Sequence, residues 1–123
     1  MRREPDGHPI PEALDPETGR IDALRLAAYL KLSVRDVAAM LERPERTVLA
    51  NPTAPELQER LAQVGFVVGG LLHATGRDLP ATLIWLTAPH PDLDYESPLR
   101  LMRSGELHVI IDLVDDILSG APT

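Results

Sequence analysis

The residue types that most often carry chemistry are spaced here in ways that predict no catalytic or metal site. The sequence holds four histidines, which are His8, His73, His90 and His108. They are scattered along the chain and lack the short spacings of metal ligands. Asp112, Asp115 and Asp116 could attract a cation, but no loop near them supplies further ligands. We therefore interpret the three aspartates as an acidic, solvated helix face and expect no metal.

Serines and glycines also lack the settings that catalysis and phosphate binding need. The serines fall at expected helix caps or helix ends, and none lies in a nucleophile elbow: Ser33, Ser97, Ser104 and Ser119. Gly69 and Gly70 lie inside an apolar run rather than between a strand and a helix, so they form no phosphate-binding loop. We predict that the protein is not an enzyme and holds no cofactor.

Composition indicates the elements that must position any site. Hydrophobic residues make up 44% of the 123 residues but aromatic residues only 3%, so the core must be built from Leu, Val, Ile and Ala. Such a composition favours helices, and no useful β-type alternation appears, so we predict an all-α fold. There is no cysteine for a disulfide. The longest apolar run, Val64 to Leu72, is too short to cross a bilayer, and no signal-peptide core precedes it, so we expect a cytoplasmic protein without membrane contact.

Charge is spread unevenly along the chain, whose net charge is -7. Residues 20–62 carry seven basic and six acidic side chains, whereas residues 78–123 carry two basic and eight acidic ones. The first region could therefore approach nucleic acid weakly, while the second suits a protein partner with a basic surface. The two halves are predicted to make different contacts.

Helix signals divide the N-terminal half. Residues 1–19 contain four prolines and few apolar side chains, which predicts a disordered, mobile arm. A short helix is expected from Ile21 to about Lys31. Ser33 can cap a second helix, with Asp36 in the place of an approximate capping box, and this helix must close before Pro44. A third short helix follows and ends before Pro52.

The pattern next predicts a long helix over residues 54–75, ended at Gly76. Leu57, Leu61 and Val64 begin a seam of apolar side chains for packing against another helix. Gly65 and Gly69 form a G-x-x-x-G spacing within it. This spacing has two interpretations, a close approach of another backbone or small residues tolerated in a crowded core.

The C-terminal half is predicted to hold three further helices. One covers residues 78–86 and carries Trp85, which we interpret as a structural anchor of the core. A loop rich in proline and aspartate over residues 88–96 separates it from a short helix capped by Ser97, begun by Pro98 and ended by Gly105. A last amphipathic helix begins at Leu107 and ends at Gly120.

The segment "SVRDVAAMLERPERTVLAN" has the pattern of a helix-turn-helix. Ala38 is small enough for two helices to cross closely, and Val48 can pack beneath them. Glu42 occupies the turn position where glycine is common, and Glu45 would repel phosphate, so tight DNA binding by this protein alone is an open question. The candidate DNA-binding residues are Arg35, Arg43, Glu45, Arg46, Thr47 and Asn51.

The C-terminal half adds a series of motifs that no general fold rule demands. Trp85 is followed by a loop, by the Ser97-Pro98 helix start, by Gly105-Glu106 and by an apolar helix with a late glycine. In this order the series resembles the toxin-binding domain of the Xre/MbcA/ParS antitoxins. The upstream "LKLSVRDVAAMLERPERTV" is similar to the helix-turn-helix of the same family, so the resemblance covers roughly residues 21–120.

The resemblance implies an antitoxin that blocks a RES-domain toxin, an enzyme that consumes NAD. It also implies a homodimer that represses its own operon through operator DNA, alone or in complex with the toxin. The matching positions implied to face the toxin are Ser97, Pro98, Arg100, Arg103, Gly105 and Glu106, with Ser119, Gly120, Ala121, Pro122 and Thr123 as a plug for the active site. The expected organisation is an arm at 1–19, a helix-turn-helix region at 20–62 and a toxin-binding domain at 63–123.

Two alternatives remain open at the level of the sequence. The chain could be a stand-alone dimeric helix-turn-helix transcriptional regulator whose C-terminal half only dimerises. It could also be an interaction module in which the helix-turn-helix no longer binds DNA. The candidate residues that separate these alternatives are Arg46 and Thr47, because only a DNA-binding protein needs them to hold its operator.

Overall fold

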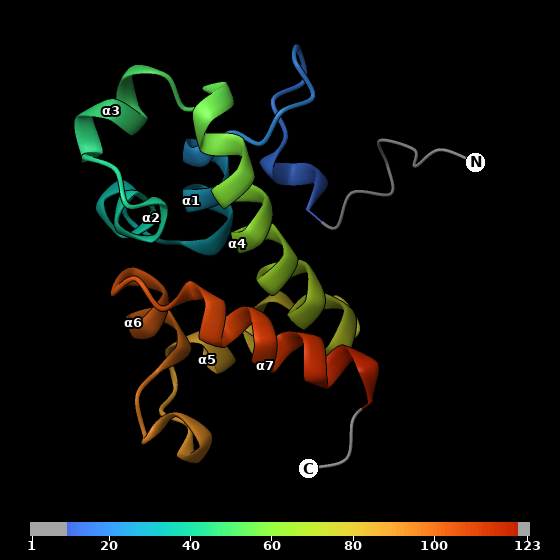
Figure 1. Cartoon of the computed structure of the whole chain (residues 1–123). Helices are drawn as coiled ribbons and strands as arrows, with labels where there is room; N and C mark the ends of the chain where they lie inside the picture. The colour runs from blue at the N-terminus through green and yellow to red at the C-terminus, as the bar shows by residue number, and fades with distance from the viewer. Residues whose placement is uncertain (1–9, 121–123) are drawn as a thin grey trace.

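The computed structural model describes residues 10–120, and this part of the chain is built from α-helices (Figure 1). The α-helices are α1 (Ala23–Leu30), α2 (Val34–Leu41), α3 (Glu45–Ala50), α4 (Pro55–Ala74), α5 (Leu79–Thr87), α6 (Pro98–Arg103) and α7 (Leu107–Ser119). Two short 3-10 helices accompany them, η2 (Pro11–Ala13) and η3 (Pro91–Leu93). Within residues 10–120 the only β-type pairings are two isolated bridges. The predicted all-α class is confirmed.

Side-chain caps start the first helices. The Asp22 carboxylate accepts hydrogen bonds from the backbone N–H groups of Leu24 and Arg25, so α1 begins two residues later than the sequence suggested. The Ser33 hydroxyl accepts from the backbone N–H of Asp36 at 3.0 Å and caps α2 as predicted. These caps satisfy N–H groups that lack a partner in the first turn of a helix.

The mobile arm expected at residues 1–19 is wrong for residues 10–19. Ile10 and Ala13 are each 1% exposed, and η2 lies against α1. The backbone N–H of Asp22 also donates to the carbonyl of Ala13 at 2.8 Å. The many prolines suggested disorder, but here Pro11 begins a 3-10 turn, and two apolar side chains anchor the segment in the core. Residues 1–9 lie outside the described part of the chain.

The long helix α4 runs through the molecule and supplies the centre of the hydrophobic core, as predicted (Figure 1). A close helix approach occurs at Gly70, outside the G-x-x-x-G pair, and not at Gly65. A Cβ atom at Gly70 would lie 2.6 Å from Cγ1 of Val114 on α7, whereas one at Gly65 would meet its nearest neighbour, Cδ1 of Ile21, at 3.9 Å. At Gly65 the glycine is therefore a tolerated small residue, while Gly70 lets α4 and α7 cross.

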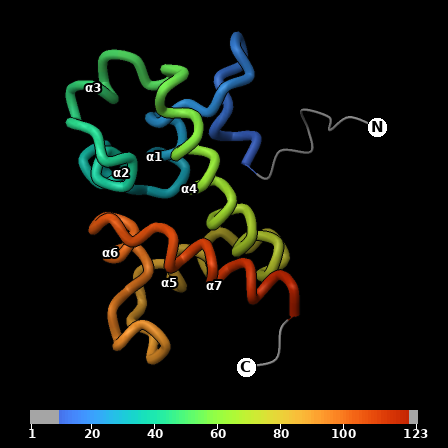
Figure 2. Tube along the Cα trace, viewed as in Figure 1, coloured from blue at the N-terminus to red at the C-terminus, as the bar shows by residue number. Residues whose placement is uncertain are grey.

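The C-terminal helices pack onto both α4 and the N-terminal helices. The tube in Figure 2 shows α6 beside α2, and the two helices are in contact. Buried side chains from α1, α2, α4, α6 and α7 belong to one continuous cluster, so the two expected regions share a core. The α7 helix ends at Gly120, with φ of 68°, as predicted. None of the helices described is both long enough and apolar enough to cross a membrane.

Candidate functional site

The pair α2 and α3 has the packing that the helix-turn-helix pattern requires. Ala38 and Val48 are 3% and 0% exposed, so they form the inner face of the pair as predicted. Glu42 ends α2 with φ of 57°, a left-handed conformation that glycine adopts more easily. The glycine-like turn position noted in the sequence is therefore real, although a glutamate occupies it.

The candidate DNA-binding residues are all exposed, but they do not form one cluster. Arg46, Thr47 and Asn51 line an open hollow of about 400 Å³ between α3 and the start of α4. Glu45 opens α3 beside them, and Arg35 lies on α2, away from that hollow. The guanidinium of Arg43 donates to the backbone carbonyl of Glu42 at 3.1 Å.

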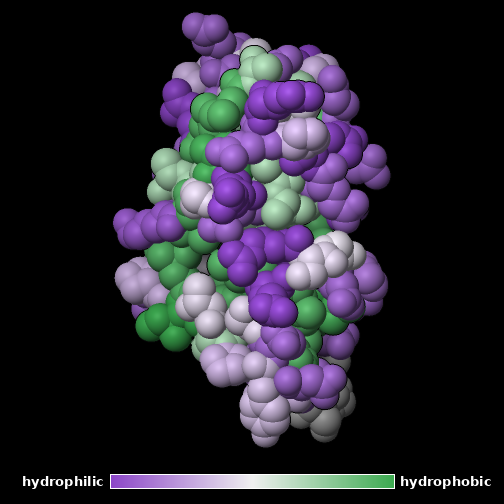
Figure 3. Space-filling model, turned by 90° about the vertical axis from the view of Figure 1, so that its left-hand side faces the viewer, coloured by the Kyte–Doolittle hydropathy of each residue, from purple (hydrophilic) through white to green (hydrophobic). Residues whose placement is uncertain are grey.

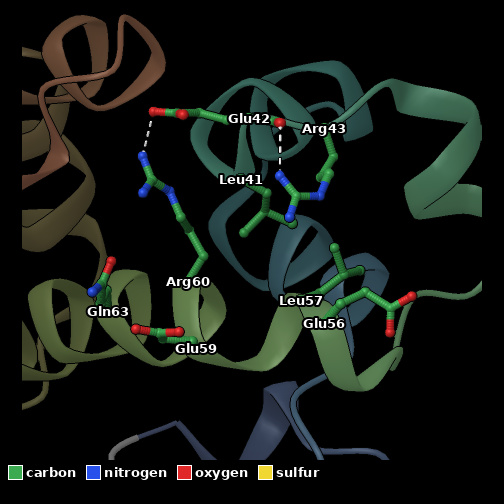
Figure 4. Close-up of a pocket in the computed structure, with 8 residues that line it drawn as sticks. All are labelled: Leu41, Glu42, Arg43, Glu56, Leu57, Glu59, Arg60 and Gln63. Atoms are coloured by element: carbon green, nitrogen blue, oxygen red, sulfur yellow. Dashed lines mark hydrogen bonds and ion pairs between the residues drawn. The ribbon is translucent and has the colours of Figure 1, made fainter.

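A second hollow of about 230 Å³ lies between the α2–α3 turn and α4 (Figure 4). Arg60 of α4 forms an ion pair with the Glu42 carboxylate and also donates from Nε to the carbonyl of Met40 at 3.1 Å. Arg60 therefore fastens the turn onto α4 and is not a free cation. Since Glu56 and Glu59 also line the hollow, its walls are unsuited to an isolated anion.

Asp36 links the α2–α3 pair to the C-terminal helices. Nη1 of Arg103, on α6, donates to Oδ1 of Asp36, on α2, at 2.8 Å. Burial by itself raises the pKa of Asp36, but hydrogen bonds from Arg103 and Ser33 and the Arg103 charge outweigh it, so the pKa is lowered. The sequence predicts only a capping position for Asp36 and does not reveal this contact, because Arg103 is 67 residues away.

The residues implied to face a toxin occupy different settings. The Ser97 hydroxyl accepts from the backbone N–H of Arg100 at 3.2 Å and so caps α6, while Pro98 is buried. Arg100 is exposed and pairs with Glu96, its Nε 2.9 Å from Oε1. These positions form the start of α6 as predicted, and two of them have structural roles.

The α6–α7 turn and the end of α7 hold the remaining candidates. Gly105 has φ of 84°, and a Cβ atom there would lie 3.5 Å from Oε2 of Glu42. Glu106 is exposed at the start of α7. Ser119 donates to the carbonyl of Asp116 at 3.1 Å, next to the terminal Gly120. The last three residues of the expected plug, Ala121, Pro122 and Thr123, lie outside the described residues.

Trp85 is partly buried and packs against the core. Its ring centroid lies 4.6 Å from that of His90, and Nε2 of His90 is 3.0 Å from the Trp85 carbonyl oxygen. His90 also pairs with Glu96 in an isolated bridge, which folds the loop at 88–96 back on itself. The side chain of Tyr95 is 71% exposed at the tip of this loop.

No group of three or more histidine, aspartate or glutamate side chains within residues 10–120 is arranged to hold a metal ion. Two exposed surfaces carry the candidate residues. One is the exposed face of α3, and the other is the edge formed by α6, the following turn and the end of α7.

Comparison with known proteins shows that one solved structure has a similar fold. No family model and no curated protein sequence matches the chain. A chain in the crystal structure of the M. tuberculosis MbcT-MbcA toxin-antitoxin complex matches with a TM-score of 0.56 and 21% sequence identity. The match covers 82% of this chain and 94% of that one. At this identity the likeness shows that the two chains share a fold, and that fold occurs in a toxin-antitoxin complex.

Proposed function

We propose that this protein is the cytoplasmic antitoxin of a toxin-antitoxin pair and has no catalytic activity of its own. The observation that carries the proposal is the fold shared with a chain of the MbcT-MbcA complex over 94% of that chain. The C-terminal motifs noted in the sequence support it independently, because they resemble the toxin-binding domain of Xre/MbcA/ParS antitoxins. That resemblance points to a RES-domain, NAD-consuming toxin as the partner.

The partner-binding surface in this proposal is the edge from Ser97 to Glu106 together with the C-terminal end of α7. Arg100 and Glu106 are exposed there, whereas Pro98 is buried and acts by shaping the helix. Asp112, Asp115 and Asp116 give the end of α7 a negative face. Such a face suits a cleft whose positive charge holds the phosphates of a dinucleotide.

Removal of residues 119–123 tests this proposal. Cells expressing the RES-domain toxin encoded beside this protein should lose protection when the shortened protein replaces the full chain. The circular dichroism spectrum and melting temperature should stay close to those of the full chain, since the deletion begins at the last residue of α7. A protein lacking residues 1–9 serves as the matched control and should protect fully. Full protection by the protein lacking 119–123 would contradict the proposed plug.

A second candidate function is DNA binding, as a homodimer, at the operator of the same operon. It is supported by the grouping of Arg46, Thr47 and Asn51 on the exposed side of α3. A stand-alone regulator should shift a duplex from the region upstream of its own gene without any toxin, and the shift should weaken with salt. A shift that appears only after toxin is added would favour the antitoxin complex as the repressor. No shift with or without toxin would leave an interaction module that does not bind DNA.

A further inference from the structure

An apolar groove of about 240 Å³ opens between the end of α1, α5 and α6. Six apolar side chains line it: Leu30, Leu32, Leu83, Ile84, Leu86 and Leu99. Ile84 is 66% exposed, more than any other aliphatic side chain among the exposed large hydrophobic residues described. Figure 3 shows hydrophobic residues (green) on the left of this face and a further group at its lower right, among hydrophilic ones. The exposed Ile84 at this groove is a place where a side chain of another molecule could be buried.

The groove also carries a positive charge at its wall. Lys31, the only lysine in the sequence, lines it and is exposed. Its backbone has φ of 58° and ends α1, so the side chain departs from the helix end rather than from a helix face. An occupant that fits must therefore present aliphatic side chains with a carboxylate beside them.

The C-terminal end of α7 has this combination. Ile117 and Leu118 are 41% and 38% exposed, and the exposed Asp115 and Asp116 directly precede them. The other exposed aliphatic side chains lack acidic neighbours, since Leu49 stands between Val48 and Ala50 and Ile84 between Leu83 and Trp85. Tyr95 stands between Asp94 and Glu96, but its side chain is aromatic. A hollow of about 240 Å³ can receive one or two aliphatic side chains, given that cavities of ~150 Å³ hold a benzene molecule.

We propose that the end of α7 of one copy docks into the α1–α5–α6 groove of a second copy. In Figure 1, α7 ends on the right of the molecule, whereas α6 lies to the left, so one copy offers both halves of the contact on different sides. Such a head-to-tail contact uses two different patches and leaves one of each free. Assembly then continues until a ring closes or a filament forms.

This contact stands apart from the proposed antitoxin function, but it would affect that function. Ser119 and Gly120 directly follow the docked residues, so a neighbouring copy would cover the start of the segment proposed as the plug. Self-association and toxin binding then compete for the end of α7. The toxin should therefore dissociate the assemblies, each copy exchanging its neighbour for the toxin.

Sedimentation velocity on the full chain tests the contact directly. The weight-average mass should rise with concentration beyond twice the 13.5 kDa of one copy. Ile84→Asp removes the groove half and Ile117→Asp the α7 half, and each should weaken association roughly tenfold or more, because an apolar side chain no longer leaves water. Both positions are exposed, so circular dichroism should match the unchanged protein. Leu49→Asp, at a position 50% exposed on α3, is the matched control and should associate normally.

Mixing the two variants gives the sharpest readout. An intact α7 end on Ile84→Asp can enter the intact groove on Ile117→Asp, so the mixture should form pairs that grow no further. A contact between identical patches would give no such rescue. If Ile84→Asp fails to fold, Lys31→Glu replaces it, and association should be restored by Asp115→Lys/Asp116→Lys at low salt. A protein that stays monomeric at all concentrations, or variants that associate like the unchanged chain, would overturn the proposal.

Discussion

The two surfaces proposed for macromolecular contact are built in different ways. On α3, the side chains of Arg46 and Thr47 are exposed. Within residues 10–120, neither side chain forms a hydrogen bond that ties α3 to a distant part of the fold. At the α6 edge, Ser97 caps the helix, Pro98 is buried and Arg103 reaches across to α2. Proposed contact and folding can therefore be separated on the first surface, whereas on the second the residues proposed for contact also hold the fold together.

The helix α4 explains why the two surfaces are still parts of one body. Its buried side chains contribute to the core on both sides, and Arg60 fixes the α2–α3 turn through Glu42. A Cβ atom at Gly105 would meet the same Glu42 carboxylate from the α6–α7 turn. The difference between the surfaces thus predicts a graded series of effects on stability, largest where α4 meets α7 and smallest on α3.

The largest expected effect is at the crossing of α4 and α7. Gly70→Val should lower the free energy of unfolding by about 1–3 kcal/mol, because the added atoms overlap the buried Val114 and the partly exposed Leu118. Gly65→Ala is the matched control and should leave stability unchanged or raise it by up to about 1 kcal/mol, since alanine favours the helix. Urea unfolding followed by circular dichroism measures both. Equal effects at the two glycines would show that the helix approach at Gly70 is not tight.

Substitutions at the start of α6 should have the next largest effect on the free energy of unfolding. Ser97→Ala removes the hydroxyl that caps the helix and should lower the free energy of unfolding by about 1 kcal/mol. Arg100→Ala, at a largely exposed side chain, should change it by less than about 0.5 kcal/mol. The pair separates the structural and contact roles at this edge: loss of toxin binding by Arg100→Ala at unchanged stability indicates contact. Similar losses of stability in both variants would argue that the whole edge is structural.

Local signals made most helix ends predictable from the sequence. Ser33 and Ser97 cap the helices expected of them, and Gly120 ends α7, because capping depends on residues only a few positions apart. The all-α class and the long α4 followed from apolar spacing in the same way. These features needed no knowledge of how the helices pack.

Contacts between distant parts of the chain were not predictable in this way. The Asp36–Arg103 and Glu42–Arg60 pairs join residues whose proximity depends on the finished packing of α2 against α6 and α4. The burial of Ile10 was missed for the same reason, since its neighbours in sequence are polar or proline-rich. The sequence identified the helices that carry the candidate site but not the ion pairs that hold them together.

The Asp36–Arg103 pair should make a smaller, pH-dependent contribution to the free energy of unfolding. In a double-mutant cycle with Asp36→Asn and Arg103→Gln, the coupling at neutral pH should be below about 1 kcal/mol, because both side chains are partly exposed. The pKa of Asp36 is lowered in the folded protein, so the contribution is complete above the unfolded value near 3.8 and is lost as the pH falls through the folded pKa. Urea unfolding across this range measures it. A coupling that is unchanged at low pH would contradict an ionised Asp36 as its source.

The smallest effect on stability is expected on α3, where contact and folding are separate. Arg46→Ala and Thr47→Ala should each change the free energy of unfolding by less than about 0.5 kcal/mol, since both side chains are exposed. If α3 binds DNA, each variant should nevertheless weaken binding to the upstream duplex, and Arg46→Ala should also reduce the salt dependence because a phosphate contact is lost. Gel shifts and urea unfolding on the same samples measure the two properties together. Arg20→Ala, outside α3 but also exposed and basic, controls for the loss of charge. Equal weakening of DNA binding by Arg20→Ala would indicate attraction by net charge alone. If the α3 variants lost as much stability as Ser97→Ala, the exposed residues of α3 would also be needed to hold the fold.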